Sequence, residues 1–345
     1  TTGKPVTIVS RTSPQAVPHL FEITVDTRKN QPLVLKEEKT DWEKDHGTRV
    51  EIEMEASYKK GRRSVDDYVE QTALSNPHCK VIYTAPGSPT VTYERAVHEL
   101  PEEAKEIKPH PYGVELGRLM RMFQDSPERH VSTALKNDFS RMTPKVVDDI
   151  LKIAGVSPKM RPRDLDTPAT ERVHKAFTKV KIMAPPTNCL SPVGQEALLK
   201  GLRARFKADY YDAVTRPPAV YRGNPFQVEV ALAHGGDLPS DELVEVFRFA
   251  NRVPLQYQAS ACAVTKSVLS IDWRSYGMQM SKGALPSGPM VLMLHIASVW
   301  VPFTSESKEA VAHYDEILEE IRLALQECAR ELSVWLSRKV KLKAN

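Results

Sequence analysis

Residues 291–310 read VLMLHIASVWVPFTSESKEA, and this stretch decides the architecture of the C-terminal half of the chain. Its first eleven residues form a nearly unbroken apolar, β-rich run between Pro286 and Pro302, too short to cross a bilayer. Such a run predicts a strand that is buried on both faces of a sheet. We expect His295, in the middle of this strand, to be a hydrogen-bonded core residue rather than a catalyst.

A polar loop follows Pro302 and places Lys308 between the buried strand and the helix predicted after it. A lysine held between two rigid elements can reach a phosphate group as a point charge. The alternative is an ordinary surface lysine at the start of a helix, and the residue by itself does not decide between the two.

A long helix is predicted from the loop to the C-terminus, because apolar residues recur there at alternating spacings of three and four. These residues are Val311, Tyr314, Leu318, Ile321, Leu325, Cys328, Leu332 and Trp335. About 30 residues at ~1.5 Å each make a rod of roughly 45 Å. We therefore expect this helix to project from its domain as a stalk that carries movement.

The bulk composition is that of an ordinary protein of two or three domains. The chain has 345 residues, of which 41% are hydrophobic and 27% charged, enough for packed cores with a polar surface. The four cysteines lie far apart without a C-x-x-C pair, which predicts reduced thiols and a cytoplasmic protein rather than zinc or disulfides. No signal peptide or membrane span is evident, so we expect no membrane partner. We interpret the opening TTGKPVTIVSRT, which lacks an initiator methionine, as the start of a fragment.

The first part of the chain, to about residue 108, is predicted to be mainly strands with some helix. In the segment TRVEIEMEA, Val50, Ile52 and Met54 alternate with glutamates, which predicts a strand with one buried face. A helix is predicted after Ser64 as its N-cap, and a hairpin around residues 86–89.

The middle of the chain, from about residue 109 to 185, has helical patterning, with Gly155 ending one helix. Short helices joined by basic turns suit a nucleic-acid module and equally suit a spacer. After it come a helix at 194–206, two strands, a helix and the buried strand, an order that implies a right-handed crossover.

Two stretches offer chemistry for binding a nucleic-acid backbone, whereas no metal-ligand spacing, nucleophile elbow or phosphate-binding loop is present. The first is YKKGRRS at 58–64, where cations surround a glycine; it fits a duplex backbone or a solvated turn. The second is IDWRSYGM at 271–278, where Trp273, Arg274 and Tyr276 offer two flat faces and a guanidinium. The alternative for the second stretch is an aromatic helix cap against the core.

Taken together, these stretches resemble the B subunit of DNA topoisomerase VI, the archaeal type IIB enzyme. RPPAVYRGNPFQVEVALAHGG, RFANRVPLQYQASACAVTKSV and VPFTSESKEA resemble its transducer domain. NDFSRMTPKVVDDIL resembles its helix–two-turn–helix insert, and TTGKPVTIVSRT resembles the strand after its glycine-rich ATP lid. The resemblance covers essentially the whole chain.

The resemblance implies an α+β fold in four parts. Residues 1–108 would be the C-terminal part of a GHKL ATPase domain, and 109–185 a small helix–two-turn–helix domain. Residues 186–308 would be a βαβ transducer domain, ribosomal protein S5 domain 2-like, and 309–345 the stalk helix.

The resemblance also implies roles for particular residues. Lys308 matches the lysine that reaches the ATP γ-phosphate and senses hydrolysis. Thr48, in the stretch GTRVE, matches a threonine near the adenine. The basic loop of the family matches Lys60, Gly61, Arg62 and Arg63, and its W-K-x-Y DNA element matches Trp273, Arg274 and Tyr276, with Arg in place of Lys.

The cofactors and partners follow from the same resemblance: ATP, Mg²⁺, a second B subunit, the DNA-cleaving A subunit and double-stranded DNA. The asparagine that helps hold Mg²⁺ and the adenine-binding aspartate would lie upstream of Thr1, so no metal ligand is expected here and this piece alone should be inactive. The alternatives are a GHKL-type ATP clamp without strand passage and a passive DNA-binding scaffold. The helical insert argues against the clamp, whose relatives join the two domains directly.

Overall fold

The computed structural model describes the backbone of residues 2–26 and 31–344, with side chains as far as residue 342. The chain divides into two compact units, Thr1–Lys60 and Gly61–Asn345. This boundary was not predicted from the sequence, which placed the first division near residue 108.

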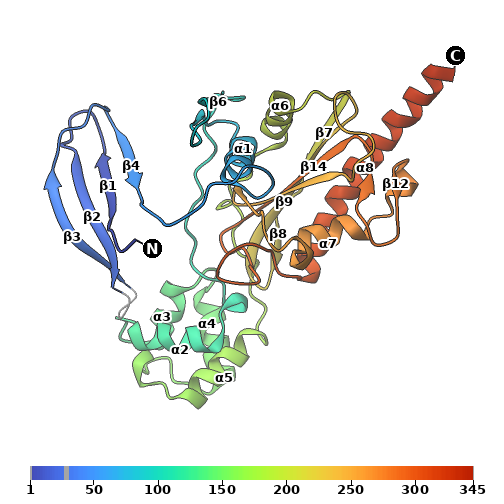
Figure 1. The fold of residues 1–345 in the computed structure, drawn as a ribbon. Helices are drawn as coiled ribbons and strands as arrows, with labels where there is room; N and C mark the ends of the chain where they lie inside the picture. Colours follow the sequence, from blue (N-terminus) through green and yellow to red (C-terminus); the bar gives the residue numbers. More distant parts are fainter. Residues whose placement is uncertain (1, 27–30, 345) are drawn as a thin grey trace. The chain divides into compact units, whose positions relative to one another are not determined.

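The first unit contains a four-stranded antiparallel sheet (Figure 1), as the strand-rich patterning predicted. Its order is β3 (Gln31–Lys39), β2 (His19–Asp26), β1 (Val6–Arg11) and β4 (Gly47–Glu51). The prediction of a buried face on the last strand is wrong. β4 ends at Glu51, and the side chains of Val50, Ile52 and Met54 are 56%, 55% and 66% exposed. The physical reason is that the described part of this unit contains no helix to cover that face.

The second unit opens with a helix and a hairpin that were both predicted. Helix α1 (Val65–Ser75) begins after Ser64, whose side chain accepts a hydrogen bond from the backbone N–H of Asp67. Strands β5 (Val81–Tyr83) and β6 (Val91–Tyr93) pair antiparallel. The helix packs through Leu74 into a core shared with Leu198, so α1 is integrated with the rest of this unit.

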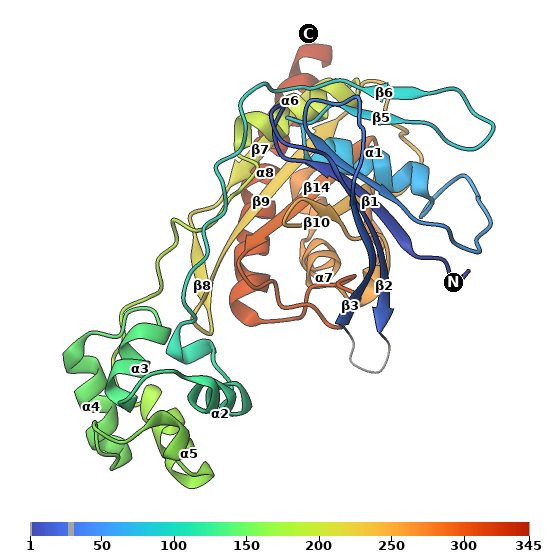
Figure 2. The ribbon, with the colours of Figure 1, turned by 90° about the vertical axis from the view of Figure 1, so that its left-hand side faces the viewer.

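A helical module with its own core follows. It comprises η1 (Pro111–Gly113), α2 (Leu116–Asp125), α3 (Val131–Asp138), α4 (Pro144–Ala154), η2 (Pro162–Asp164) and α5 (Thr167–Phe177), drawn green in Figure 2. Leu119, Leu135, Ile150 and Phe177 are among the buried side chains of this core. Gly155 ends α4 in a left-handed conformation, as predicted, and its N–H bonds to the carbonyls of the last turn.

The large sheet has the order β11, β10, β14, β9, β7, with β8 paired to β9. Its strands are β7 (Tyr210–Thr215), β8 (Ala219–Tyr221), β9 (Asn224–His234), β10 (Glu245–Ala250), β11 (Val253–Pro254) and β14 (Met290–Ser298). β14 is parallel to β10 and antiparallel to β9, and all nine of its residues are buried. The predicted strand buried on both faces is confirmed, and the parallel pair requires the crossover that the element order implied.

Helices cover both faces of this sheet (Figure 1). On one face lie η3 (Ala259–Ala261), α7 (Ala263–Ser270), η4 (Trp273–Tyr276) and α8 (Asp315–Ala344), with the small hairpin of β12 (Gln279–Met280) and β13 (Pro286–Ser287) nearby. On the other face lie α1 and α6 (Gln195–Arg205). Lys308, Trp273 and Arg274 therefore belong to a three-layer body.

The long C-terminal helix is confirmed, but its start is not where the sequence placed it. α8 is 30 residues long, and its stripe of Ile321, Leu325, Cys328 and Leu332 is wholly buried. Near its end Leu342 is 79% exposed, so the last turns lie beyond the core. Val311 does not belong to the helix, because it forms an isolated bridge with Phe303. In the part of the chain that the structure describes, no helix is both long and apolar enough to cross a membrane.

Candidate functional site

The loop that carries Lys308 is a closed, pinned turn. Phe303 and Val311 form an isolated antiparallel bridge at its base, and the N–H of Thr304 donates to the carbonyl of Ala310 over 2.9 Å. Ala310 and Val311 are wholly buried. The loop therefore has a fixed base in the core and an exposed tip. The sequence predicted that this loop leads directly into the long helix. That prediction is wrong, because α8 begins only at Asp315.

The tip of this loop holds Lys308 in an unusual backbone conformation. Its φ is +56°, and its N–H donates to the carbonyl of Ser305 over 3.1 Å. A left-handed conformation at a residue other than glycine costs about 1–2 kcal/mol. Among the residues that the structure describes, the Lys308 ammonium has no hydrogen-bond or ion-pair partner. The side chain is thus presented to solvent, with its charge available for an anion.

The base of the Lys308 loop is tied to the start of α7. The N–H of Ala263 donates to the carbonyl of Val311 over 2.8 Å, and the N–H of Val311 donates to Sγ of Cys262 over 3.4 Å. Nearer the tip, Gln258 donates to the carboxylate of Glu309 over 2.7 Å. A force on Lys308 would therefore act on α7 through these hydrogen bonds.

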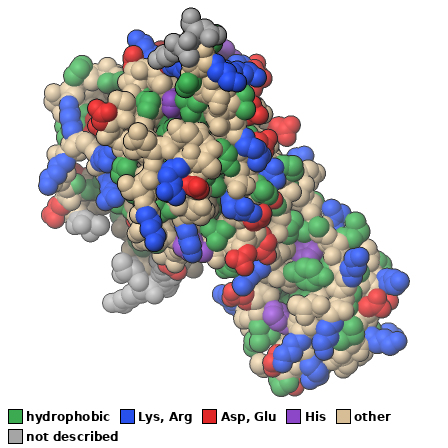
Figure 3. Space-filling view, turned by 90° about the vertical axis from the view of Figure 1, so that its right-hand side faces the viewer, with side chains coloured by type: hydrophobic (Ala, Val, Ile, Leu, Met, Phe, Trp, Pro, Cys, Tyr) green, Lys and Arg blue, Asp and Glu red, His purple; other side chains and the backbone are tan. Residues whose placement is uncertain are grey.

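The basic loop spans the boundary between the two units. Lys60 ends the first unit, whereas Arg62 and Arg63 belong to the second. The N–H of Arg63 donates to Asp67 over 2.8 Å, and its carbonyl accepts from the hydroxyl of Tyr257 over 3.3 Å. These contacts fix the backbone of the loop, and the charge of Arg62 acts on the carboxyl group of Glu245. On the face drawn in Figure 3, basic side chains are interspersed with acidic ones.

The expectation that Trp273 offers a flat face to a ligand is wrong. Its side chain is 0% exposed, and its indole N–H donates to the carbonyl of Val268 over 2.9 Å. It lies in the core that α7 and α8 share, and Tyr276 packs partly buried against the same core. The interpretation as an aromatic cap is therefore correct for Trp273. Arg274 is exposed and lies 3.0 Å from the carboxylate of Asp272.

Thr48 lies in the first unit, at the start of β4. It pairs across the sheet with Ser10, and the two hydroxyl oxygens are 3.4 Å apart. Its side chain is exposed. Lys308 belongs to the second unit, so the structure describes each of these two residues within its own unit.

A buried polar network, which the sequence did not reveal, supports the strand that leads to Lys308. Glu229 accepts from His295 Nδ1 over 2.7 Å and from the N–H groups of Val193 and Gly194. Burial by itself would raise the pKa of Glu229, but the hydrogen bond from His295 and those from these two N–H groups hold it below its usual value. The prediction that His295 is a hydrogen-bonded core residue is confirmed. One feature of the sequence indicated that Glu229 is a buried polar residue, namely its position as an acidic residue within an otherwise apolar strand.

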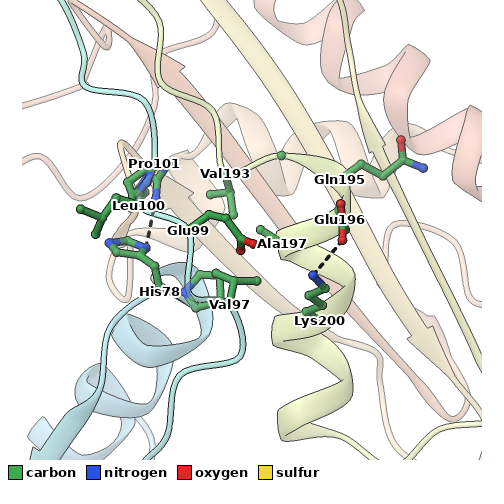
Figure 4. A pocket seen from close by; sticks show the side chains of 13 residues that line it. His78, Val97, Glu99, Leu100, Pro101, Val193, Gln195, Glu196, Ala197 and Lys200 are labelled. Carbon is green, nitrogen blue, oxygen red and sulfur yellow. Dashed lines mark hydrogen bonds and ion pairs between the residues drawn. The ribbon is translucent and has the colours of Figure 1, made fainter.

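A cavity of about 440 Å³ lies beside this network, between the start of α6 and the segment that follows α1 (Figure 4). Burial, followed by the charges of Arg252 and Arg95, lowers the pKa of His78 on its wall. Glu196 and Lys200 form an ion pair of 2.7 Å there. The wall carries groups of both signs, so charge alone does not select a ligand for it.

The described residues hold no group of three or more His, Cys, Asp or Glu side chains arranged to bind a metal ion. The four cysteines are free thiols, and Cys189, Cys262 and Cys328 are buried. Burial raises the pKa of Cys328 well above its usual value, which makes this thiol unreactive.

Known proteins are similar in sequence to this chain over nearly its whole length. Residues 185–345 match the family model described as the topoisomerase VI B subunit, transducer. The B subunit of type 2 DNA topoisomerase 6 from Thermococcus gammatolerans is 34% identical, with 98% of this chain and 67% of the relative covered. The chain belongs to the family of type 2 DNA topoisomerase 6 B subunits.

Two further members of the family give the extent of the match. The protein of Methanococcoides burtonii is 45% identical over 99% of this chain and 55% of the relative. That of Archaeoglobus fulgidus is 41% identical over 98% of this chain and 56% of the relative. The chain thus spans about half the length of these relatives. A solved structure, the 43K ATPase domain of Thermus thermophilus gyrase B with an aminocoumarin, covers 99% of this chain and 71% of its own at 10% identity, with a TM-score of only 0.34.

Proposed function

We propose that this chain is part of the ATP-operated B subunit of a type IIB DNA topoisomerase, which passes one duplex through a break in another. Its task would be to transmit ATP binding and hydrolysis to a DNA-cleaving A subunit, in an assembly of two A and two B subunits in the cytoplasm. The observation that carries the proposal is the Lys308 loop, which is closed by its own bridge, is hydrogen-bonded to the start of α7 and lies within the stretch that matches the transducer family model.

In this proposal Lys308 is the residue that senses the nucleotide. An ammonium that has no partner among the described residues, at the tip of a closed turn, fits a role at the γ-phosphate of ATP. When the phosphate leaves, the lysine loses its counter-charge and the loop loses an anchor. Because the base of the loop is hydrogen-bonded to the start of α7, the change would reach the transducer as rigid-body movement. The long helix α8 would carry this movement toward the A subunit.

Besides Lys308, the family resemblance implies a role for Thr48 at the nucleotide. Thr48 would lie near the adenine, and its exposed hydroxyl is compatible with a polar contact there. The Mg²⁺ that accompanies ATP would be held by an asparagine beyond this chain. We infer that a chain of this extent does not hydrolyse ATP by itself, and that a second B subunit completes the closed state.

The DNA contacts in this proposal are made by charge and not by base reading. Lys60, Arg62 and Arg63 would bind DNA phosphates, and Arg274, on the short helix η4, would add a further contact. Neutralising phosphates releases counterions, so such contacts hold a duplex without regard to its sequence. Trp273 would act indirectly, by fixing the short helix that carries Arg274.

The test uses the full-length B subunit assembled with its A subunit. We expect Lys308→Ala to abolish ATP-dependent relaxation of supercoiled DNA while the subunits still assemble. The matched control is Lys266→Ala, an exposed lysine on α7, which should retain relaxation. If Lys308→Ala left both relaxation and ATP-dependent dimerisation at the wild-type level, the sensor role would be refuted and a passive DNA-binding scaffold would be favoured.

A further inference from the structure

A second cavity, of about 270 Å³, lies behind the basic loop. Its wall is formed by the entry to α1, by β10 and by the segment that leads from β11 to η3. Arg62 and Arg63 contribute to it from the loop, and Arg248 and Gln256 from the sheet edge. The cavity therefore joins a surface loop, whose proposed ligand is a duplex, to the interior of the second unit.

The cavity is lined by two buried donors that have no partner among the described residues. Arg248 is only 4% exposed; its Nη2 donates to the carbonyls of Leu255 and Tyr257 over 2.6 and 3.0 Å, but Nη1 makes no hydrogen bond. Nε2 of Gln256 is likewise buried without a partner. A buried donor left unpaired costs about 1–3 kcal/mol, and a guanidinium cannot escape this cost by losing its proton. A hydrogen-bond acceptor bound in the cavity would satisfy both donors.

The charges around the cavity favour an anion as that acceptor. Three of its lining residues are arginines, namely Arg62, Arg63 and Arg248, and two are acidic. The carboxylate of Asp67 is already engaged, because it accepts from the N–H of Arg63 over 2.8 Å and from Gln71 over 2.7 Å. Glu245 is the remaining carboxyl group, and it disfavours an anion in its own part of the cavity. The favourable position is therefore next to Arg248 and Gln256.

We propose that this cavity binds a phosphate group, held from inside by Arg248 and Gln256 and from the rim by Arg62 and Arg63. The tetrahedral oxygens of phosphate can accept from several donors at once, and a guanidinium is a strong donor to phosphate. The phosphate comes either from a DNA backbone drawn in past the basic loop or from free inorganic phosphate. Neither ATP nor an A subunit is needed for this binding, so it can fail or succeed independently of the function proposed above.

The experiment titrates this 345-residue chain with inorganic phosphate at constant ionic strength and measures binding by calorimetry. We expect saturable binding to one site. In Gln256→Glu the side chain keeps its shape, but an acceptor and a negative charge replace the donor, and affinity should fall by roughly tenfold or more. Gln195→Glu, at an exposed position on α6, is the matched control and should bind as wild type does. Circular dichroism checks that each variant is folded.

A second variant tests the contribution of Arg248 independently of Gln256. Arg248→Lys keeps a cation but loses the planar donors, so we expect weaker phosphate binding even where the fold is retained. Absence of saturable binding by wild type, or equal affinity in wild type and Gln256→Glu, would overturn the proposal and leave water as the partner of these donors.

A duplex-binding arm identifies the source of the phosphate. If phosphate at fixed ionic strength competes with a short duplex, and Gln256→Glu weakens duplex binding, the DNA backbone supplies the group. If Gln256→Glu loses phosphate binding but keeps wild-type duplex affinity, free phosphate is the ligand.

Discussion

Nδ1 of His295 lies 2.7 Å from Oε2 of Glu229, and both side chains are 0% exposed. Nε2 of the same imidazole accepts from the N–H of Arg252 over 3.0 Å, which places the ring proton on Nδ1. The pair joins β9 to β14 and binds the entry to α6 through Val193 and Gly194. The strand that leads to Lys308 is thus anchored to two other parts of the unit by one buried carboxylate.

Replacement of Glu229 by glutamine should destabilise the protein by about 1–3 kcal/mol, because the new amide donor faces an N–H or imidazole donor in a buried place. Chemical denaturation of the two proteins at neutral pH measures this difference. The control is Glu196→Gln, whose exposed carboxylate forms an ion pair with Lys200, and which should change stability by less than about 1 kcal/mol. Equal stability of Glu229→Gln and wild type would contradict the network described above.

The carboxylate of Glu229 should also make the free energy of unfolding depend on pH. The pKa of Glu229 in the folded protein lies below its ordinary value of 4.5. Its contribution is therefore fully present above pH 4.5 and is lost as pH falls through the lower, folded pKa. We expect a series of denaturation midpoints from about pH 6 to about pH 3 to fall less steeply for Glu229→Gln than for wild type. A steeper fall in the variant would show that the sign of the shift is wrong.

The two neighbours Trp273 and Arg274 should behave differently when each is replaced by alanine. Loss of a buried tryptophan typically costs 3–5 kcal/mol, or about 4 kcal/mol here, because a cavity remains in the core. Arg274→Ala removes an exposed pair with Asp272 and should change stability by less than about 1 kcal/mol. It should instead lower the salt dependence of duplex binding by about one phosphate contact. Thermal unfolding and a salt series separate the two effects.

The sequence could not distinguish these two residues, because burial is decided by contacts between distant segments. WRSY suits an exposed turn and a core cap equally well, and only the packing of Trp273 against the α8 layer settles its place. The alternation of Val50, Ile52 and Met54 indicated a strand correctly only as far as Glu51, and it was a false sign of burial, since burial needs a second layer. The strand β14 could be predicted, because a continuous apolar run marks burial on both faces.

The contact between Glu229 and His295 could not be predicted from the sequence for the same reason. Glu229 and His295 are 66 residues apart in sequence and meet only because the register of β9 and β14 places them directly opposite each other. Lys308 could be singled out by its place after the strand. Its left-handed backbone conformation could not be predicted, because that conformation depends on the bridge that closes the loop.

Replacement of Lys308 by glycine separates backbone strain from charge. Glycine adopts a positive φ without steric cost, so Lys308→Gly should relieve about 1 kcal/mol of strain, set against glycine's greater freedom in the unfolded chain. We expect Lys308→Gly to be at least as stable as Lys308→Ala, which keeps the strain, while both lack the ammonium. Thermal unfolding compares the two variants. Markedly lower stability of the glycine variant would mean that the left-handed conformation is not a source of strain.

The basic loop should determine the salt dependence of duplex binding. Each phosphate contact contributes about 0.9 to the slope of log affinity against log salt, so Lys60/Arg62/Arg63→Ala should flatten it by roughly two to three. Arg62 and Arg63 are expected to contribute more than mobile surface lysines, because Asp67 and Tyr257 fix the loop backbone.

The matched control removes the same number of charges from the helical module, at the exposed lysines 145, 152 and 179. A smaller change in the control supports a dedicated site in the loop and identifies the module as a spacer. Equal flattening in both variants would mean that net charge, and not the geometry of the loop, sets the affinity of this protein for DNA.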